Sequence, residues 1–432
     1  MYDYGKVLHH FCARLIKITN HGLLISASQN KINFEKKKIR GEKRLVINKD
    51  VLKKFKKELE EEEDKEKKAR IKEIEKKEIK SLTLKDKAVK KDKFILSEQK
   101  NYLQQKGIDF AGLSDSEITN LLSNSTYYFK LTTYRKNYLI NAEGKYEGLS
   151  LKQLQDLATI DMYLRFIIIQ MTLEIEHSLK TKVISEITQD SNEDGYTIIE
   201  EFNDYLSKSH LEIEAIKKKK REEWVASNTE IPYYLKEKTY TAIEEKIMAR
   251  NSNITDYSYD LYQKRSSNPA IWVLIELMSY GQLGNFLEFY TTSKKRGYKE
   301  FKRASKFIKN TKKMRNAAAH NRPIIYDLCT ASSIEGKLPI EMRQYLEHID
   351  IEEGVSNEIL RNIKLFDFLT ILLLHDVYIF FYRMKEIRKE DLNKLITRCY
   401  KNKDIYNMSN ITNQQFKNIF EILIKVVDHY GK

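Results

Sequence analysis

The feature that most constrains the fold is a long helical pattern in residues 157–187. Apolar residues recur there at every third or fourth position, which places them on one face of an α-helix. They are Leu157, Ile160, Leu164, Ile168, Met171, Ile175 and Leu179. The chain has 432 residues with only 14 Gly and 4 Pro, and so few helix breakers favour helices throughout. We therefore predict an all-α protein built on a helical bundle.

Residues 1–94 are predicted to form an N-terminal extension. Residues 23–27 and 45–47 have the pattern of short strands. From residue 51 to about residue 93 the composition changes to Lys and Glu, with opposite charges three and four residues apart. This spacing predicts an exposed helical arm. A nucleic-acid clamp is the alternative, but the mixed charge argues against strong binding of phosphates.

Residues 95–150 are predicted to form a small helical module. Its core is expected to include Tyr127, Phe129 and Tyr134. Because cations are interleaved with these rings, at Lys130 and Arg135, the alternative is a surface that stacks RNA bases and contacts phosphates.

Residues 151–432 are predicted to be the main helical domain. A polar, less regular stretch at about residues 188–265 is interpreted as an insertion between core helices. Gly281 and Gly284 are expected to break a helix that begins near residue 270. Further helices are predicted at residues 363–384 and 416–427.

The charge of the chain points to a polyanionic partner. With 77 Lys+Arg against 62 Asp+Glu, the formal net charge is +15. Nucleic acid is the commonest partner of such an excess. An AT-rich coding bias toward Lys, Ile and Asn is an equally simple explanation, so charge alone leaves the partner open.

The cysteines and the apolar segments indicate an intracellular protein without a membrane span. Cys12, Cys329 and Cys399 are too far apart for a CxxC metal pair and odd in number, which is typical of a reducing cytosol. The N-terminus lacks the pattern of a secretory signal. The most apolar segment, residues 363–382, contains charged residues and is interpreted as a buried core helix.

Residues 315–320, Arg-Asn-Ala-Ala-Ala-His, are the strongest candidate for chemistry. Asn316 and His320 are four residues apart and share a helix face, and Pro323 stops the helix just beyond them. RNA can be cut without a metal because its 2′-hydroxyl is an internal nucleophile. His320 suits proton transfer, Arg315 suits the phosphate charge, and Asn316 could orient either group. No HExxH motif or carboxylate cluster suggests a metal or another cofactor.

Spacing alone does not make this motif unusual, because Arg and His recur at comparable spacing at Arg14 and His21 and at Arg343 and His348. Residues 315–320 differ by the Asn after the Arg, the alanine spacer and a basic strip before the motif. The predicted RNA contacts are Lys302, Arg303, Lys306, Lys309, Lys312, Lys313 and Arg322, with Lys130 and Arg135 from the small module. Arg165 and Glu176 are eleven residues apart and share a helix face. They could support the site or only lie at the edge of the buried face.

The motif resembles the R-N-x-x-x-H form of the HEPN ribonuclease motif, and the chain resembles the Abi-like abortive-infection proteins of the AbiD and AbiF type. Further matching blocks are Ser97-Glu98-Gln99, residues 127–131, residues 161–180, residues 271–276 and Ser279-Tyr280-Gly281. Together they cover roughly residues 95–330. The chain departs from the pattern at Lys180, where many relatives carry Arg, a change that preserves the charge.

The resemblance implies a HEPN-type helical core and metal-independent RNA cleavage in defence against phage, with Arg315, Asn316 and His320 as catalytic residues. It also implies a homodimer in which two motifs form a composite site. Some members work with a small structured RNA. The alternative is therefore an RNA-binding HEPN scaffold that such a non-coding RNA holds inactive or assembles with.

Overall fold

The structure, a computed structural model, describes residues 84–432 and four strands within residues 17–46. The description excludes residues 126, 226–229, 295–296, 329–332, 348, 350–359, 407 and 409. The chain divides into two compact units, Met1–Lys93 and Phe94–Lys432.

The described part of the first unit contains two short hairpins and one helix. Strand β1 (Lys17–Thr19) pairs antiparallel with β2 (Gly22–Leu24), and β3 (Glu35–Ile39) pairs antiparallel with β4 (Glu42–Val46). The strand patterns seen in the sequence overlap β2 and β4. The predicted charged arm lies outside the described residues as far as residue 83, and helix α3 (Leu84–Lys90) follows it.

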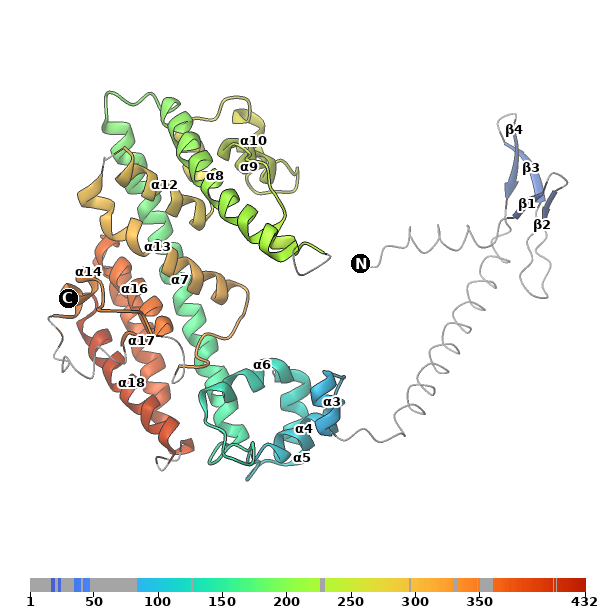
Figure 1. The fold of residues 1–432 in the computed structure, drawn as a ribbon, viewed down its shortest axis with the longest axis vertical. Helices are drawn as coiled ribbons and strands as arrows, with labels where there is room; N and C mark the ends of the chain where they lie inside the picture. The colour runs from blue at the N-terminus through green and yellow to red at the C-terminus, as the bar shows by residue number, and fades with distance from the viewer. Residues whose placement is uncertain are drawn as a thin grey trace. The chain divides into compact units, whose positions relative to one another are not determined.

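The second unit is a helical bundle, which confirms the predicted all-α class (Figure 1). Its described elements are α4 (Leu96–Gln105), α5 (Asp115–Asn120), η1 (Leu121–Ser125), α6 (Tyr128–Thr133), η2 (Tyr134–Asn137), α7 (Leu151–Gln189), α8 (Thr197–Val225), η3 (Tyr233–Leu235), α9 (Ile243–Arg250), α10 (Tyr259–Arg265), α11 (Ile271–Leu277), α12 (Tyr280–Thr292), α13 (Tyr298–Ala319), α14 (Ile340–Leu346), α16 (Ile363–Tyr378), α17 (Tyr382–Lys401), η4 (Lys403–Ile405) and α18 (Ile411–His429). No helix in the described ranges is both long and apolar enough to cross a lipid bilayer.

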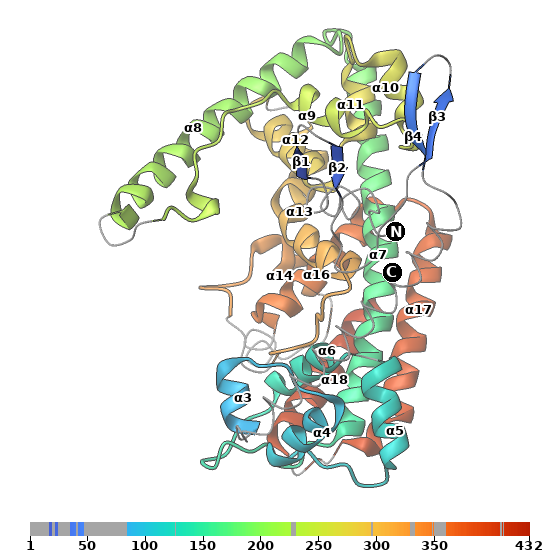
Figure 2. The ribbon, with the colours of Figure 1, turned by 90° about the vertical axis from the view of Figure 1, so that its right-hand side faces the viewer.

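Helix α7 is the axis of the bundle, and it contains the predicted helix of residues 157–187. It begins earlier than predicted because Ser150 and Gln153 form a capping box. The Ser150 hydroxyl accepts a hydrogen bond from the Gln153 amide at 3.2 Å, and the Gln153 side chain accepts one from the Ser150 amide at 2.7 Å. Helices α13, α16 and α17 pack along α7 (Figure 2).

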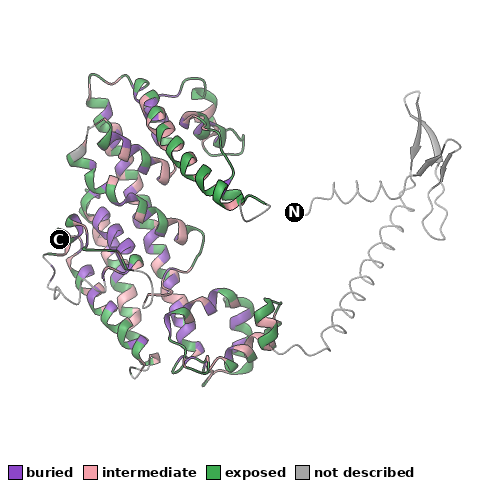
Figure 3. Ribbon diagram, viewed as in Figure 1, coloured by how far each residue is buried: buried purple, intermediate pink, exposed green. Residues whose placement is uncertain are grey.

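The predicted insertion is more regular than the sequence suggested. Its longest element, α8, has 29 residues and buries only Ile198, Ile199 and Phe202. Beyond these residues α8 extends from the bundle with a mostly exposed surface (Figures 2 and 3). The prediction of a less regular segment was wrong because the outer part of α8 lacks the apolar stripe by which buried helices are recognised.

Gly281 and Gly284 lie inside helix α12, so their prediction as helix breakers was also wrong. A Cβ atom on Gly281 would stand 2.6 Å from Nζ of Lys312, and one on Gly284 would stand 2.9 Å from Cγ2 of Ile308. Both neighbours belong to α13. The glycines therefore allow α13, which carries the Arg-Asn-His motif, to lie close against α12.

The apolar run predicted as one helix at residues 363–384 is divided between α16 and α17. Helix α16 ends at Tyr378 and α17 begins at Tyr382. The apolar sequence continues through the turn, where Phe380 is 90% exposed, so hydrophobicity did not reveal the helix end. The final helix predicted at residues 416–427 is confirmed within α18, which Asn410 caps.

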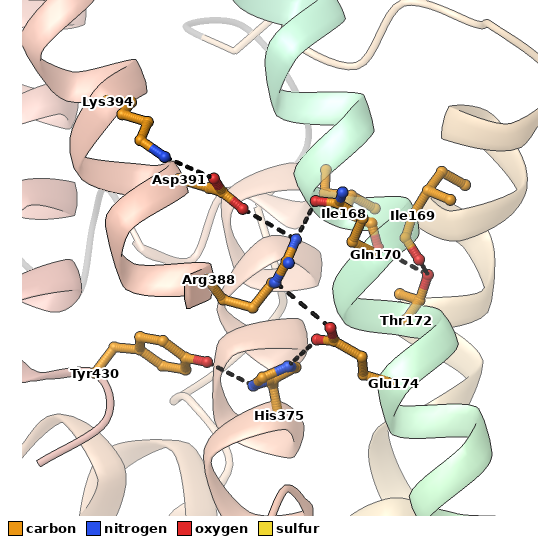
Figure 4. A network of polar contacts seen from close by, with 10 residues as sticks. All are labelled: Ile168, Ile169, Gln170, Thr172, Glu174, His375, Arg388, Asp391, Lys394 and Tyr430. Atoms are coloured by element: carbon orange, nitrogen blue, oxygen red, sulfur yellow. Dashed lines mark hydrogen bonds and ion pairs between the residues drawn. The ribbon is translucent and has the colours of Figure 1, made fainter. Parts of the chain in front are cut away.

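A buried polar network joins these helices at one level of the bundle (Figure 4). His375 of α16 is fully buried, and its Nε2 donates to Glu174 of α7 at 2.7 Å. The Tyr430 hydroxyl donates to Nδ1 of the same ring at 2.5 Å. Arg388 of α17 lies 3.5 Å from Glu174 and 3.0 Å from Asp391. Burial lowers the pKa of His375, so the neutral ring is the form that this network holds.

The small module has its own hydrophobic cluster, which includes Leu103, Leu131 and Tyr134. Tyr134 is buried as predicted. Tyr127 is 57% exposed and Phe129 is 77% exposed, so their prediction as core residues was wrong. The short helix α6 buries Lys130, Leu131 and Thr132 instead, and the aromatic composition could not indicate which of its residues are buried.

Candidate functional site

The Arg-Asn-His motif lies at the C-terminal end of α13, where the backbone forms a Schellman motif. His320 is the C-cap residue, and Asn321 follows it in the left-handed conformation with φ of 55°. The Asn321 amide donates to the Ala318 carbonyl at 3.1 Å, and the Arg322 amide donates to the Ala317 carbonyl at 2.8 Å. Asn tolerates this conformation better than most residues. The turn fixes His320 at the last position of the helix.

The three motif side chains lie at or near the surface. Arg315 and Asn316 are partly buried, and His320 is exposed. Nη1 of Arg315 donates to Oδ1 of Asn316 at 3.3 Å. Within the described residues the imidazole of His320 has no hydrogen-bond partner. Asn316 therefore engages Arg315 in this structure and does not orient the His320 ring.

A buried carboxylate beneath the motif holds the segment that follows it. Asp161 of α7 is fully buried and accepts hydrogen bonds from the amides of Ile324 at 2.6 Å and Ile325 at 2.8 Å. It also accepts from the Tyr134 hydroxyl at 3.0 Å and forms an ion pair with Arg165. Burial, with a contribution from Asp161, raises the pKa of Tyr134 above its usual range. The phenol is therefore a fixed hydrogen-bond donor to this carboxylate.

Arg165, one of the two predicted supporting residues, lies inside this cluster. Its side chain is 4% exposed, and its Nη1 also donates to the Arg322 carbonyl at 3.4 Å. Arg165 thus helps to hold the backbone of the segment that follows the motif. Asp161 was not predicted as a site residue. The signal that could have revealed it is an acid and a base four residues apart, Asp161 and Arg165, within an apolar helix.

Glu176, the second predicted supporting residue, pairs with a lysine of its own helix. It forms an ion pair with Lys180 at 3.3 Å, and Lys180 also donates to the Glu276 carbonyl at 2.9 Å. Both Glu176 and Arg315 act electrostatically on the buried Tyr280 hydroxyl, whose pKa is raised chiefly by burial. The charges of Glu176 and Arg315 therefore lie on the same side of the α7–α13 contact.

Lys130 is not at the surface, contrary to its prediction as an RNA contact. It is 8% exposed, and its Nζ donates to Oδ1 of Asn321 at 2.7 Å. Burial lowers its pKa, and the nearby charge of Arg165 acts in the same direction. Lys130 therefore stabilises the left-handed turn after His320, and its burial makes it unsuited to contact a phosphate.

Arg135 is also directed into the small module. It is partly buried beside Tyr128 and Tyr146, and it influences the pKa of both phenols. Its Nη1 is buried without a hydrogen-bond partner among the described residues. Arg135 is therefore only partly exposed, and its role as an RNA contact stays a prediction.

The predicted cations of α13 are all exposed, as is Arg322. The helical spacing places four of them on the same face as Asn316 and His320; these four are Lys302, Lys306, Lys309 and Lys313. Glu341 pairs with Lys306 at 2.6 Å and with Lys302 at 3.7 Å, and Glu288 pairs with Lys309 at 2.8 Å. The lysine side chains of these pairs remain 42–58% exposed, although Glu341 itself is buried. A basic stripe therefore leads along α13 to His320.

In the described ranges no group of three or more His, Cys, Asp or Glu side chains is arranged to hold a metal ion. The geometry thus defines a helical-bundle protein with a polar site at the end of a basic helix. Residues 120–326 match the family model described as Abi-like protein. The match ends at Tyr326, so it includes the motif and the Asp161 cluster but not α16–α18. No curated protein and no solved structure matches the chain.

Proposed function

We propose that this protein is a metal-independent endoribonuclease that acts in a bacterial abortive-infection system. The role in abortive infection is supported by the match of residues 120–326 to the Abi-like family model. The ribonuclease activity rests on one observation, the exposed imidazole of His320 at the end of the basic stripe with Arg315 and Asn316 one turn before it. The R-N-x-x-x-H spacing, the HEPN-type classification and RNA as the partner belong to this proposal.

The chemistry follows from the side chains present. The RNA 2′-hydroxyl attacks the adjacent phosphorus, and the bond to the 5′ oxygen breaks. His320 transfers a proton in this step, either from the nucleophile or to the leaving oxygen. Arg315 stabilises the charge that develops on the phosphate oxygens. The products are one strand with a 2′,3′-cyclic phosphate and one with a 5′-hydroxyl, and no water or metal is consumed.

A homodimer completes this mechanism. The reaction needs both a proton acceptor and a proton donor, and one motif supplies a single imidazole per chain. A second copy would supply the other. Helix α7 presents exposed apolar side chains, namely Tyr163 at 44%, Phe166 at 57% and Leu173 at 50%. We propose that a second copy covers this face and brings two motifs together in the cytoplasm.

The test is RNA cleavage by purified full-length protein in the presence of EDTA. We expect His320→Ala and Arg315→Ala to lose cleavage and cell toxicity together. His210→Ala is the matched control, because this histidine of α8 binds the Lys238 carbonyl at 2.8 Å, away from the motif. Unchanged cleavage in both motif variants would contradict the proposal.

Sequencing of RNA that copurifies with the protein distinguishes the alternative function, an RNA-binding scaffold, from the ribonuclease. An RNA-binding scaffold predicts one RNA of discrete size, retained binding and no cleavage by the wild-type protein. A ribonuclease predicts cleavage once any bound RNA has been removed. Light scattering during size-exclusion chromatography reports the proposed dimer, and Phe166→Glu is expected to shift it to a monomer.

A further inference from the structure

The second unit contains a cavity of about 830 Å³ between helices α7, α16, α17 and α18. Its wall is mainly apolar, with side chains such as Leu164, Phe368, Leu395 and Phe420. The volume lies within the range of roughly 300–1,000 Å³ that is typical of small-molecule sites. The cavity opens to solvent, because its lining residues Tyr400 and Met408 are exposed, and its apolar wall gains packing contacts when a ligand fills it.

The cavity is elongated along the helices. On α17 its wall runs from Leu392 to Tyr400, and on α18 it runs from Phe416 to Val427. At 1.5 Å per residue these stretches span ~12 Å and ~16 Å. Such a shape accommodates an extended aliphatic chain better than a compact or planar molecule.

One half-buried cation lies in the wall of this cavity. Nζ of Lys364 donates to the Tyr326 carbonyl and lies 3.3 Å from the centroid of the Tyr326 ring. Within the described ranges Lys364 forms no ion pair with a carboxylate. Burial lowers its pKa to about 8 despite the opposing charge of Asp327. A desolvated ammonium group in an apolar wall is stabilised by an anionic partner.

We propose that this cavity binds a long-chain aliphatic carboxylate, with the alkyl chain along α17 and α18 and the carboxylate on Lys364. The apolar length selects the chain, and the cation selects its acidic head group. Met314 and Ile324, which flank the Arg-Asn-His motif, form part of the same wall. The ligand would therefore stabilise the segment that positions the motif, and its binding does not depend on RNA cleavage.

Oleate is the probe, titrated into lipid-stripped full-length protein by calorimetry, with oleyl alcohol as its uncharged counterpart. We expect one oleate per chain, a raised melting temperature and weaker binding of the alcohol. Lys364→Met should weaken oleate binding at least about tenfold and leave the alcohol unchanged, because only the charge-assisted contact is removed. Lys364→Arg keeps the charge and should retain the preference for oleate.

Two variants test the location. Leu395→Trp fills the cavity from α17 and Leu423→Trp fills it from α18, and each should weaken oleate and oleyl alcohol alike. Circular dichroism identifies a variant that fails to fold, in which case the other carries the test. Absence of oleate binding by the wild type would mean that α18 closes the cavity and would overturn the proposal. Undiminished binding by a folded Trp variant would place the ligand elsewhere and would overturn it as well.

Discussion

Two pairs of arginine and histidine side chains in the described residues differ in their surroundings: Arg388 and His375 are buried, and Arg315 and His320 lie at or near the surface. His375 is fully buried, and both of its ring nitrogens are hydrogen-bonded, while Arg388 lies between two carboxylates (Figure 4). His320 is exposed, and among the described residues its ring has no partner, while Arg315 contacts only Asn316 at 3.3 Å. The same residue types thus occur once held in buried polar contacts and once exposed to solvent.

The difference distinguishes polar residues that stabilise the fold, such as His375, from those that the proposed chemistry would use, such as His320. Buried polar groups must find partners within the fold, and the His375 network joins α7, α16 and α17 in doing so. In a reactive site the side chains that contact the substrate are unpaired, and the hydrogen bonds that hold the site in place are made by buried residues below it. Here that buried layer is the cluster of Asp161, Arg165 and Lys130.

The largest expected effect is a difference between the two histidines: substitution of His320 should lower activity, and substitution of His375 should lower stability. His320→Ala should lower RNA cleavage by about 10²–10⁴-fold, the usual contribution of a general acid or base. Its free energy of unfolding should stay within about 0.5 kcal/mol of the wild type, as for other surface substitutions. His375→Ala should instead destabilise the fold, because it removes the ring that hydrogen-bonds both Glu174 and Tyr430. Cleavage assays and chemical denaturation measure the two quantities, and a loss of stability in His320→Ala would break the comparison.

The second effect tests the layer beneath the motif. Asp161→Ala should cost about 3–5 kcal/mol of stability, because it leaves Arg165 buried without its ion pair. Asp260→Ala is the matched control. Asp260 and Lys264 have the same spacing of four residues on α10, but both side chains are more than two-thirds exposed. This exposed pair should contribute no more than about 1 kcal/mol. If urea denaturation shows the same loss of unfolding free energy for both variants, Asp161 is not the residue that holds the segment after the motif.

The third effect is a pH dependence of stability from the buried histidine. The pKa of His375 is lowered from its ordinary 6.5, so the unfolded chain binds its proton more readily than the folded one. The stabilisation is present above pH 6.5 and is lost as the pH falls through the lowered pKa. His375→Gln keeps a donor toward Glu174 but cannot titrate. Melting temperatures measured below neutral pH should therefore fall more steeply for the wild type than for this variant, and parallel curves would exclude the effect.

The smallest effect concerns the basic stripe. Within the described ranges Lys312 and Lys313 form no ion pairs, whereas Lys306 pairs with Glu341. Lys313→Ala should weaken RNA binding a few-fold and reduce the slope of log affinity against log salt by about 0.7, as for one phosphate contact to a single strand. Lys306→Ala should change the slope less, because its cation is already partly neutralised. A filter-binding series at several salt concentrations distinguishes these outcomes.

The sequence predicted the helical class and the core of α7, because a long apolar period is written directly into the chain. The sequence could not show which polar residues are buried and which are exposed. Lys130 and Arg135 look like RNA contacts beside aromatic residues, yet the fold turns them inward. Asp161 was missed because its partners, the amides of Ile324 and Ile325, lie more than 160 residues away in the chain. Such contacts arise from tertiary packing, and the only local signal in the sequence is the four-residue spacing of Asp161 and Arg165.

The most direct test of the central claim is the chemistry of the RNA ends produced in the presence of EDTA. An internal 2′-hydroxyl nucleophile with His320 as the proton-transfer group predicts 2′,3′-cyclic phosphate and 5′-hydroxyl ends from the wild type. The same ends should appear with His210→Ala and disappear with His320→Ala. Products that carry 5′-phosphates, or cyclic phosphates still formed at the wild-type rate by His320→Ala, would contradict the account.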